Sequence, residues 1–395
     1  MIFLLITLVV LGRLVSADQK QLLALSSALS NFSQRLYQKV SVDVPNVVYS
    51  PYSIHTALYM VSLGAREDTQ TEIRNTLGIA SLGDSVYETY KELIKQMRSV
   101  TDVELNTLNA YVKKTYLITT PGSKFMLDTY GYYSGQLPSI DLVDPEGPEE
   151  LINDYFTART KNKINDLIRP GSINEHTSML LINTIFLSGT WETVFDKRRT
   201  TNKKFYQPGG KVIEVEMMID YRNVNIKKDN VSKVDVAELP FKGGRFSLYI
   251  ALPRTVNGIT DLEQLLVEPD QADQLFTGLT SVGARLVIPK FKTETMLNLN
   301  TPLKEMGITQ AFNPSSANFS GISPVQIFVN EVLQKALIEV QEIGTVAAAA
   351  RAMNVKRLSS GPLHLKENFI ADHSFVYFLR DNQTGQILLQ GKFTG

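Results

Sequence analysis

The strongest constraint on the fold is one apolar run in the middle of the chain. Residues 179–191, MLLINTIFLSGTW, form a nearly continuous apolar run that is bounded by turn-forming residues. A strand with one solvated face alternates apolar and polar side chains, whereas a strand covered on both faces reads as a continuous apolar run. This segment therefore predicts a strand inside a sheet that has other structure packed on each of its faces.

The rest of the chain divides into a helical first third and a strand-rich remainder. Three early segments space their apolar residues three or four apart, as helices do: residues 21–40, 50–65 and 84–100. The second segment starts after Ser50, a favourable N-cap, and has Pro51 at its first helical position. Later segments rich in β-branched and aromatic residues predict strands: 245–253, 284–295 and 374–393, the last a hairpin around 382–385. Partly segregated helices and mainly antiparallel strands predict an α+β fold.

The N-terminus predicts secretion. Residues 2–11 form a short apolar core, and Val15-Ser16-Ala17 offers a cleavage site with small residues at its first and third positions. We therefore expect residues 1–17 to be a signal peptide and residues 18–395 to be a single domain. The alternative is a buried N-terminal helix. No later run reaches the roughly 18 apolar residues that a membrane-spanning helix needs, so we expect no membrane segment.

Charge, cysteine content and motifs exclude several kinds of partner and site. Lys plus Arg total 40 and Asp plus Glu total 40, which gives no reason to expect nucleic acid or an anionic membrane as a partner. The chain has no cysteine, which excludes a cysteine nucleophile and thiolate metal ligands. It lacks the motifs of a nucleophile elbow, a zinc helix or a phosphate loop. Its histidines show no metal-ligand spacing: His55, His176, His364 and His373. We expect neither an enzyme, nor a cofactor, nor a metal.

The most unusual segment lies near the C-terminus. Residues 344–361, GTVAAAARAMNVKRLSSG, begin with seven small or β-branched residues and continue with basic residues and serines. No apolar stripe would pack a helix there, and no alternation would bury one face of a strand. The segment predicts an exposed stretch that a protease can cut.

Several stretches, taken in order, resemble the serpin family, and the resemblance covers almost the whole mature chain. The stretches are residues 46–65, residues 180–196 with Asn183, Gly189, Trp191 and Phe195, residues 288–294 (IPKFKTE), residues 317–323 (ANFSGIS) and residues 329–350. Each piece alone is weak, but their order and spacing make the match specific.

The resemblance implies a serpin fold, in which helices surround a large, mostly antiparallel central sheet with smaller sheets and an exposed reactive loop at about residues 344–363. It implies a secreted inhibitor that is consumed as a suicide substrate. A serine protease cuts the loop, and the freed loop inserts into the sheet as a strand and traps the acyl-enzyme. Small hinge residues would let the loop slide between two strands: Gly344, Thr345, Val346, Ala347, Ala348, Ala349 and Ala350.

The position of the cut follows from the family's spacing. Counting forward from Gly344 gives Leu358–Ser359, which suits a chymotrypsin- or elastase-like protease. The alternative bond, Arg357–Leu358, suits a trypsin-like protease, and a third reading is that Lys356 and Arg357 only keep the loop soluble. The expected partner is an extracellular serine protease, and we expect the inhibitor to act as a monomer. The rival function is a non-inhibitory serpin, a carrier or chaperone, against which the small hinge residues argue.

The family also has a polar cluster under the opening of the sheet, which is matched here by Ser50, Ser53, Asn183 and Gln334. Gln334 stands where the family usually has a histidine, so a histidine-dependent pH response would be absent. Arg351 shares its strand face with Thr345, where the family prefers small or apolar residues. Burying an unpaired guanidinium is costly, so we expect Arg351 to slow insertion of the loop.

Two surface features remain open. Lys91, Lys95 and Arg98 lie on one helical face, which resembles the serpin helix that binds heparin-like polysaccharide in some members. The alternative is a solvated face, because Glu88 and Glu92 lie nearby. Four sequons offer N-glycosylation sites: Asn31, Asn230, Asn318 and Asn382. Secretion favours glycans on the two in polar loops, Asn230 and Asn382, over the other two.

Overall fold

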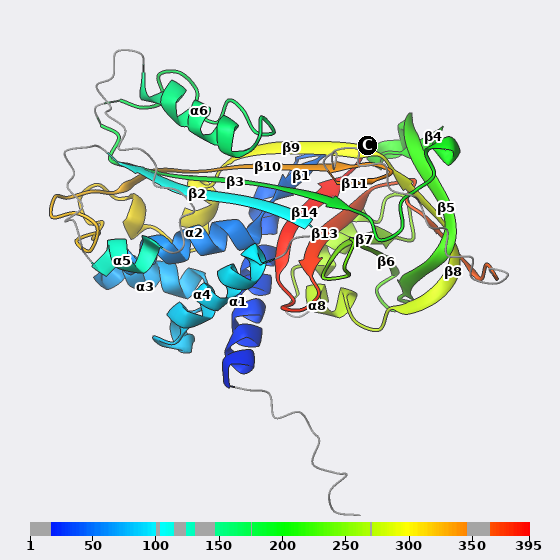
Figure 1. The fold of residues 1–395 in the computed structure, drawn as a ribbon, viewed down its shortest axis with the longest axis horizontal. Coiled ribbons are helices and arrows are strands. Elements are labelled where there is room, and N and C mark those ends of the chain that lie inside the picture. Colours follow the sequence, from blue (N-terminus) through cyan, green and yellow to red (C-terminus); the bar gives the residue numbers. More distant parts are fainter. Residues whose placement is uncertain are drawn as a thin grey trace, which may run out of the picture.

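The computed structural model describes residues 17–99, 103–113, 124–130, 147–174, 176–268, 271–345 and 364–395. Most of the expected signal peptide and most of the reactive loop, from residue 346 to residue 363, lie outside these ranges. Within them, helices predominate in the first part of the chain and strands in the rest, and Figure 1 shows helices both above and below one long sheet.

The long sheet has five strands in the order β2-β3-β11-β10-β9. Their bounds are Val103–Lys113 for β2, Met179–Thr190 for β3, Gly344–Thr345 for β11, Val329–Val340 for β10 and Phe291–Asn298 for β9. β3 is the strand expected from the apolar run, and all but two of its residues are buried. Its odd-numbered apolar residues pack into the main core, and its even-numbered apolar residues pack into a second core with helix α6, Pro148–Arg159. The predicted coverage of both faces is confirmed.

The remaining described strands form a second sheet, which has nine strands. Its strands are β1 (Val47–Tyr49), β4 (Thr201–Tyr206), β5 (Val212–Lys228), β6 (Val234–Pro240), β7 (Phe246–Pro253), β8 (Thr280–Pro289), β12 (Glu367–Ile370), β13 (Phe375–Asp381) and β14 (Ile387–Phe393). β13 and β14 form the predicted antiparallel hairpin. Most pairings in both sheets are antiparallel, and the parallel exceptions are β10 with β3 and β12 with β8.

The three predicted helices are present as α1 (Ala17–Val40), α2 (Pro51–Gly64) and α4 (Val86–Arg98). The others are α3 (Glu67–Thr76), α5 (Lys124–Tyr130), α7 (Ile259–Leu265), α8 (Gln271–Leu275) and α9 (Asn300–Glu305). α2 begins as expected, because the Ser50 hydroxyl accepts a hydrogen bond from the backbone N–H of Ser53. No described helix is both long enough and apolar enough to cross a membrane.

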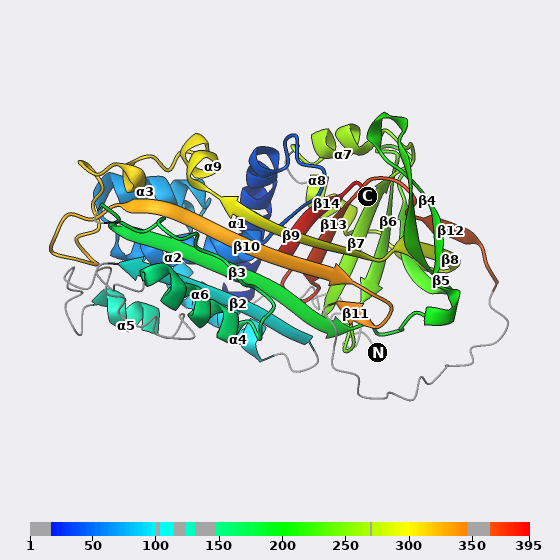
Figure 2. The same ribbon diagram turned by 90° about the horizontal axis from the view of Figure 1, so that it is seen from above.

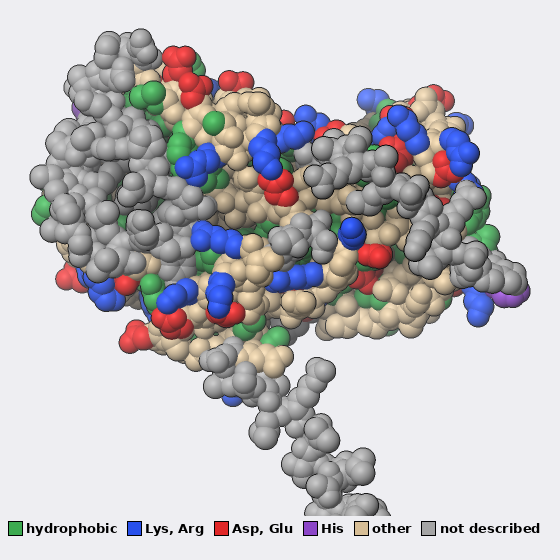
Figure 3. All heavy atoms as spheres, in the orientation of Figure 1, with side chains coloured by type: hydrophobic (Ala, Val, Ile, Leu, Met, Phe, Trp, Pro, Cys, Tyr) green, Lys and Arg blue, Asp and Glu red, His purple; other side chains and the backbone are tan. Residues whose placement is uncertain are grey.

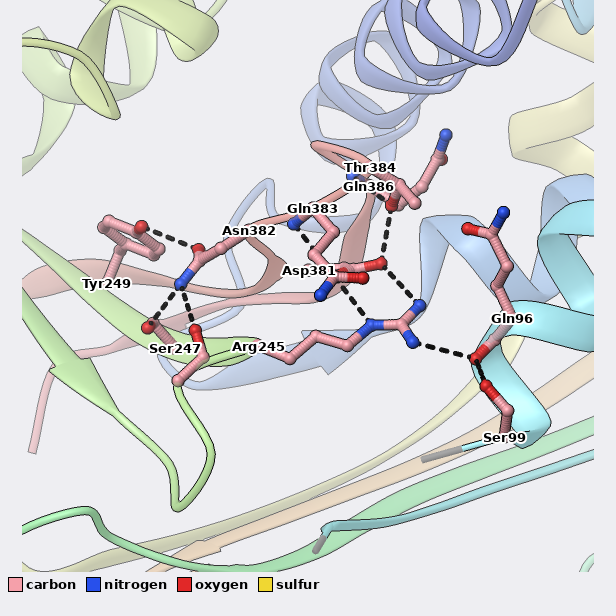
Figure 4. Close-up of polar contacts among 11 residues, drawn as sticks. Gln96, Ser99, Arg245, Ser247, Tyr249, Asp381, Asn382, Gln383, Thr384 and Gln386 are labelled. Atoms are coloured by element: carbon pink, nitrogen blue, oxygen red, sulfur yellow. Dashed lines mark hydrogen bonds and ion pairs between the residues drawn. The ribbon is translucent and has the colours of Figure 1, made fainter. Parts of the chain in front are cut away.

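A buried ion pair joins the helical part of the molecule to the nine-stranded sheet (Figure 4). The Arg245 guanidinium donates Nε to Asp381 Oδ1 and Nη2 to Asp381 Oδ2, each at 3.1 Å. Its Nη1 donates to the carbonyl of Gln96 near the end of α4 at 3.0 Å. Asp381 is fully buried and also accepts a bond from the Thr384 hydroxyl at 2.7 Å. The bidentate pair thus holds α4 against the β13–β14 hairpin.

His55 is buried inside α2 and is held neutral. Its Nε2 lies 2.9 Å from the carbonyl of Leu77, which can only accept, so this nitrogen carries the proton. Nδ1 then accepts from the Tyr90 hydroxyl at 2.6 Å. Burial lowers the pKa of His55 from 6.5 to about 4, although the bond to Leu77 opposes the shift.

We predict that His55 makes the fold less stable in mild acid. The unfolded chain binds a proton that the folded chain excludes, so the free energy of unfolding falls as the pH drops from about 6.5 to about 4. The loss attributable to His55 reaches about 3 kcal/mol. Denaturant unfolding at several pH values would measure it. A His55→Gln variant should lose this part of the pH dependence, and equal slopes in the two proteins would contradict the assignment.

Candidate functional site

The site is the place where β11 enters the five-stranded sheet between β3 and β10 (Figure 2). Gly344 lies opposite Thr190, and Thr345 lies opposite both Gly189 and Val340, antiparallel to each neighbour. Thr345 is only 1% exposed. We expected an exposed loop from Gly344 onward, and this was wrong for its first two residues. They already occupy the sheet because their backbone groups find partners on both sides.

Beyond β11 the sheet is closed. β3 and β10 pair directly and in parallel from Val329 opposite Met179 to Leu337 opposite Phe186. The two strands therefore part only at one end, where β11 lies between them. Any further residue of a strand that continued β11 would have to displace this direct pairing.

Glycine is required at position 344 by the close approach of β11 to β3. A Cβ at this position would overlap the carbonyl oxygen of Gly189 and would lie 2.9 Å from the Cα of Thr190. A Cβ on Gly189 would in turn lie 2.9 Å from the ring of Phe241. Real Cβ atoms do not approach other atoms so closely, so the seating of β11 depends on both glycines.

Polar contacts hold the segment that leads into β11. The backbone N–H groups of Trp191 and Phe195 donate to the carbonyls of Ile343 and Glu342, each at 2.9 Å. The Trp191 indole N–H donates to the carbonyl of Gln341 at 2.8 Å, and its ring stacks on Phe241 with centroids 4.4 Å apart. The turn between β10 and β11 is thus fixed to the chain that follows β3.

The side chain of Glu342 adds an ion pair to this turn. It lies 3.5 Å from the ammonium of Lys290 and accepts a hydrogen bond from the Thr200 hydroxyl at 2.9 Å. Burial alone would raise the pKa of Glu342, but hydrogen bonds from backbone, Thr200 and Lys290, with the charge of Lys290, together lower it. The carboxylate is therefore charged at neutral pH and ties the turn to the end of β8.

Farther along the seam between β3 and β10 lies a group of neutral polar side chains, which we call the amide cluster. Its members are Ser50, Ser53, Asn109, Asn183 and Gln334. Gln334 accepts from the N–H of Ser50 at 2.8 Å and donates to the carbonyl of Ser50 at 3.2 Å and to Asn183 Oδ1. Asn183 donates to Ser53 Oγ and Asn109 Oδ1, and the Ser53 hydroxyl donates to Asn109 at 3.1 Å.

The amide cluster brings together all four residues that the family resemblance implied. Gln334 and Asn183 lie directly opposite each other on β10 and β3 and bond across the seam. Asn109 was missed from the sequence, and only its position opposite Asn183 on β2 identifies it. No member carries a charge or titrates near neutral pH, so the cluster is held by amide and hydroxyl groups alone.

Helix α6 covers the other face of the seam. The Lys335 ammonium lies 2.9 Å from Glu294 and donates to the carbonyl of Asn165, which follows α6. Lys161 and Glu104 form an ion pair at 2.6 Å between the same region and β2. These contacts lie on the face opposite the amide cluster and hold α6 against the sheet.

The expected polysaccharide face on α4 is not strongly basic. Lys91 lies 3.4 Å from Glu88 and Lys95 lies 3.6 Å from Glu92, so two of the three cations face an acid on the same helix. Figure 3 shows acidic side chains mixed with basic ones on the visible face of the molecule. This pairing favours the solvated-face alternative, since a polyanion would have to compete with the helix's own carboxylates.

The sequons differ in how their amide nitrogen is used. Asn230 and Asn31 are exposed. Asn382 donates its Nδ2 to Glu238 and the carbonyl of Gly244, each at 3.2 Å. It also donates to the Ser247 hydroxyl at 2.9 Å (Figure 4). Because a glycan would be attached to this nitrogen, the folded structure argues against Asn382, which the sequence favoured. Asn318 similarly donates to Glu67 at 3.1 Å.

Several predicted residues cannot be placed. The candidate bonds at residues 357–359, the hinge residues 346–350 and Arg351 lie outside the described part of the chain. Among the described residues, no group of three or more His, Cys, Asp or Glu side chains could hold a metal ion.

Comparison with known proteins gives one consistent match. The sequence model of one family, described as "Serpin (serine protease inhibitor)", matches residues 27–395. An uncharacterized serpin-like protein from Methanosarcina mazei is 32% identical, over 96% of this chain and 89% of its own. Antichymotrypsin-2 from Bombyx mori is 30% identical, over 93% of this chain and 97% of its own.

Solved structures agree with the sequence match. Serpin48, a highly specific serpin of the insect Tenebrio molitor, superposes with a TM-score of 0.83 at 27% identity, covering 94% of this chain and 98% of its own. Human thyroxine-binding globulin in complex with thyroxine gives a TM-score of 0.83 at 26% identity, with the same coverage of 94% and 98%. The fold is therefore shared with proteins whose names indicate different functions.

We predict that Gly344→Ala expels β11 from the sheet, because the new methyl group would overlap Gly189. Hydrogen–deuterium exchange should then rise in peptides covering residues 338–345 and 188–192. The neighbouring change Ile343→Ala, at a side chain that is 49% exposed, is the matched control and should leave exchange unaltered. Unchanged protection in Gly344→Ala would mean that β3 yields instead of β11.

Proposed function

Because this chain belongs to the serpin family, whose members are usually protease inhibitors, we propose that it is a suicide-substrate inhibitor of serine proteases. The observation that carries the proposal is the seating of Gly344 and Thr345 between β3 and β10. These two residues stand where the first pairs of an inserted strand would form. The small residues that follow them, 346–350, suit the same path.

The far end of the loop is also tied down, which makes cutting a requirement. β12, Glu367–Ile370, pairs with β8 in the nine-stranded sheet, while β11 lies in the five-stranded sheet. An intact segment held at both ends cannot run the length of β3. Once a bond near residue 358 is cut, the segment after Thr345 is freed from β12 and can follow β11 into the sheet.

Insertion would be strongly downhill. If about 12 residues join the sheet at roughly 0.5–1.5 kcal/mol net per hydrogen bond, the gain is on the order of 10 kcal/mol. That gain is comparable with the whole stability of an ordinary domain. The uncut inhibitor is then metastable, and its lifetime is set by a kinetic barrier.

The trapping step follows from this energy. The protease's serine Oγ attacks the carbonyl carbon at the cut bond, forms an ester with the inhibitor and releases the new amino terminus. Insertion then pulls the ester-linked protease along the sheet. Deacylation requires a precisely placed triad and oxyanion hole, so a small displacement of the linked serine stops hydrolysis of the ester.

The class of protease that the inhibitor would bind is inferred from the residues at the candidate cleavage sites. Leu358–Ser359 favours a chymotrypsin- or elastase-like protease, with Arg357–Leu358 and a trypsin-like protease as the alternative. With residues 1–17 as a signal peptide, the inhibitor would be secreted as a monomer and would meet an extracellular protease.

A covalent complex is the direct test. The protein is mixed separately with chymotrypsin, elastase and trypsin, denatured, and resolved by gel electrophoresis. The proposal expects a band at the summed mass of inhibitor and protease with at least one enzyme. Clean cleavage by all three without such a band would favour the alternative, a non-inhibitory serpin such as a carrier.

We predict that Thr345→Arg turns the inhibitor into a substrate. Thr345 is buried between Gly189 and Val340, so a guanidinium there would be desolvated without a partner. Slower insertion leaves time for the ester to hydrolyse. Thr345→Ser is the control and should still form the complex. An unaltered yield of covalent complex from Thr345→Arg would rule out insertion through this position.

We also predict that cutting the loop raises the thermal midpoint of the inhibitor. The freed segment becomes a strand, and the added pairing stabilises the cut form. Melting curves before and after limited chymotrypsin treatment would show the difference. An unchanged midpoint would indicate that the cut segment stays outside the sheet.

A further inference from the structure

The pairing of β11 fixes which residues a longer inserted strand would meet. Thr345 lies opposite Gly189 on β3 and Val340 on β10, and both pairings are antiparallel. Each step forward along the loop therefore moves one step back along β3 and one step back along β10. Paired residues of neighbouring strands share a face of the sheet, so the side chains that face α2 can be matched position by position.

This register gives apolar surroundings to three of the residues that would face α2. Position 347 would meet Leu187 and Ile338, position 349 would meet Ile185 and Ala336, and position 353 would meet Leu181 and Val332. All six of these sheet residues are buried. The loop has Ala347, Ala349 and Met353 at the three positions, so its apolar residues match an apolar path.

Position 351 is different. Counting back six residues from Gly189 gives Asn183, and counting back six from Val340 gives Gln334. These two residues already lie opposite each other and bond across the seam. The two registers therefore converge on the amide cluster, and the residue that would enter it is Arg351.

We propose that the amide cluster is the acceptor position for Arg351 during loop insertion, and that this position makes the second half of insertion slow. The inference rests on the proposed function, because it requires a loop that inserts. During insertion the Arg351 guanidinium would meet Asn183 and Gln334 at its sides. Ser50 and Ser53 would lie beneath it.

The cluster is a poor environment for a cation. Its five members are neutral, and Ser50, Ser53 and Gln334 are fully buried. Glu294, whose partner is Lys335 on β10, lies on the opposite face of the sheet. Ser50 is also the N-cap of α2, so the positive end of that helix dipole points at the same place. A guanidinium would lose its water and gain no carboxylate in return.

The cluster is still able to accept some hydrogen bonds, which makes insertion slow rather than forbidden. Parting β3 from β10 breaks the bond between Gln334 and Asn183 and frees the Oδ1 atom of Asn183. The amide oxygens of Asn109 and Gln334 are further acceptors. A guanidinium carries five N–H donors, and these few neutral oxygens satisfy them only in part.

The test compares Arg351→Thr with the wild type in two measurements. The first is the number of inhibitor molecules consumed per protease, which should fall towards one in the variant. The second is the thermal midpoint of the form cut by chymotrypsin, which should rise above that of cut wild type. Chymotrypsin is used because trypsin could cut after Arg351 itself. Arg198→Thr removes an equally charged but exposed guanidinium and should alter neither value.

A charge introduced into the cluster separates this explanation from a general effect of the loop. Gln334→Glu supplies a carboxylate where Arg351 would arrive. It should lower consumption per protease when Arg351 is present, and should raise it when combined with Arg351→Thr, since the carboxylate is then buried unpaired. Opposite effects of Gln334→Glu on inhibitor consumption in the two backgrounds would show that positions 334 and 351 are energetically coupled.

Three outcomes would overturn the inference. If Arg351→Thr matches the wild type in both measurements while cutting still raises the midpoint, insertion occurs and the amide cluster accepts the guanidinium without delay. If Gln334→Glu has the same effect in both backgrounds, residue 351 does not enter the cluster. If no variant forms a covalent complex or gains stability on cutting, the inference fails together with the proposed function.

Discussion

The direct pairing of β3 with β10 is the contact on which the rest of the structure depends. The two strands are parallel and adjacent over most of their length. An antiparallel strand placed between them would replace one parallel ladder with two antiparallel ladders, and antiparallel pairing is slightly more stable per residue. Insertion as proposed would therefore add hydrogen bonds that the closed sheet lacks, and β11 lies at the end where it would begin.

The closed sheet is held by contacts on both of its faces and at the turn that precedes β11. The amide cluster bonds β2, β3 and β10 to the start of α2 on one face. On the other face, Lys335 and Lys161 tie the α6 region to the sheet. Glu342 and Lys290 fix the turn that precedes β11. If the loop inserts as proposed, these contacts must be broken or shifted first, so they would contribute to the kinetic barrier of insertion.

The sequence was sufficient for elements whose pattern is local. The strand at 179–190, the first helices and the β13–β14 hairpin follow from apolar spacing and turn residues over a dozen positions. β11 was missed because its pairing joins Thr345 to Gly189, which are far apart in the sequence. Asn109 carries no local signal and belongs to the amide cluster only through its register with Asn183. Asn382 looked like a free turn residue, yet its amide bonds to Glu238 and Ser247 on other strands.

Arg351 affects the free energy of loop insertion and the rate of insertion to different degrees. Insertion of the whole strand gains on the order of 10 kcal/mol, while an unpaired buried guanidinium costs several kcal/mol, so insertion stays downhill with Arg351 in place. Rates respond differently, because each ~1.4 kcal/mol added to a barrier slows a step tenfold. If even part of the cost is present when residue 351 passes between Asn183 and Gln334, insertion slows while hydrolysis of the acyl-enzyme does not. Arg351 would then lower the efficiency of inhibition and also lower the stability of the cut, inserted form, while insertion as a whole stays favourable.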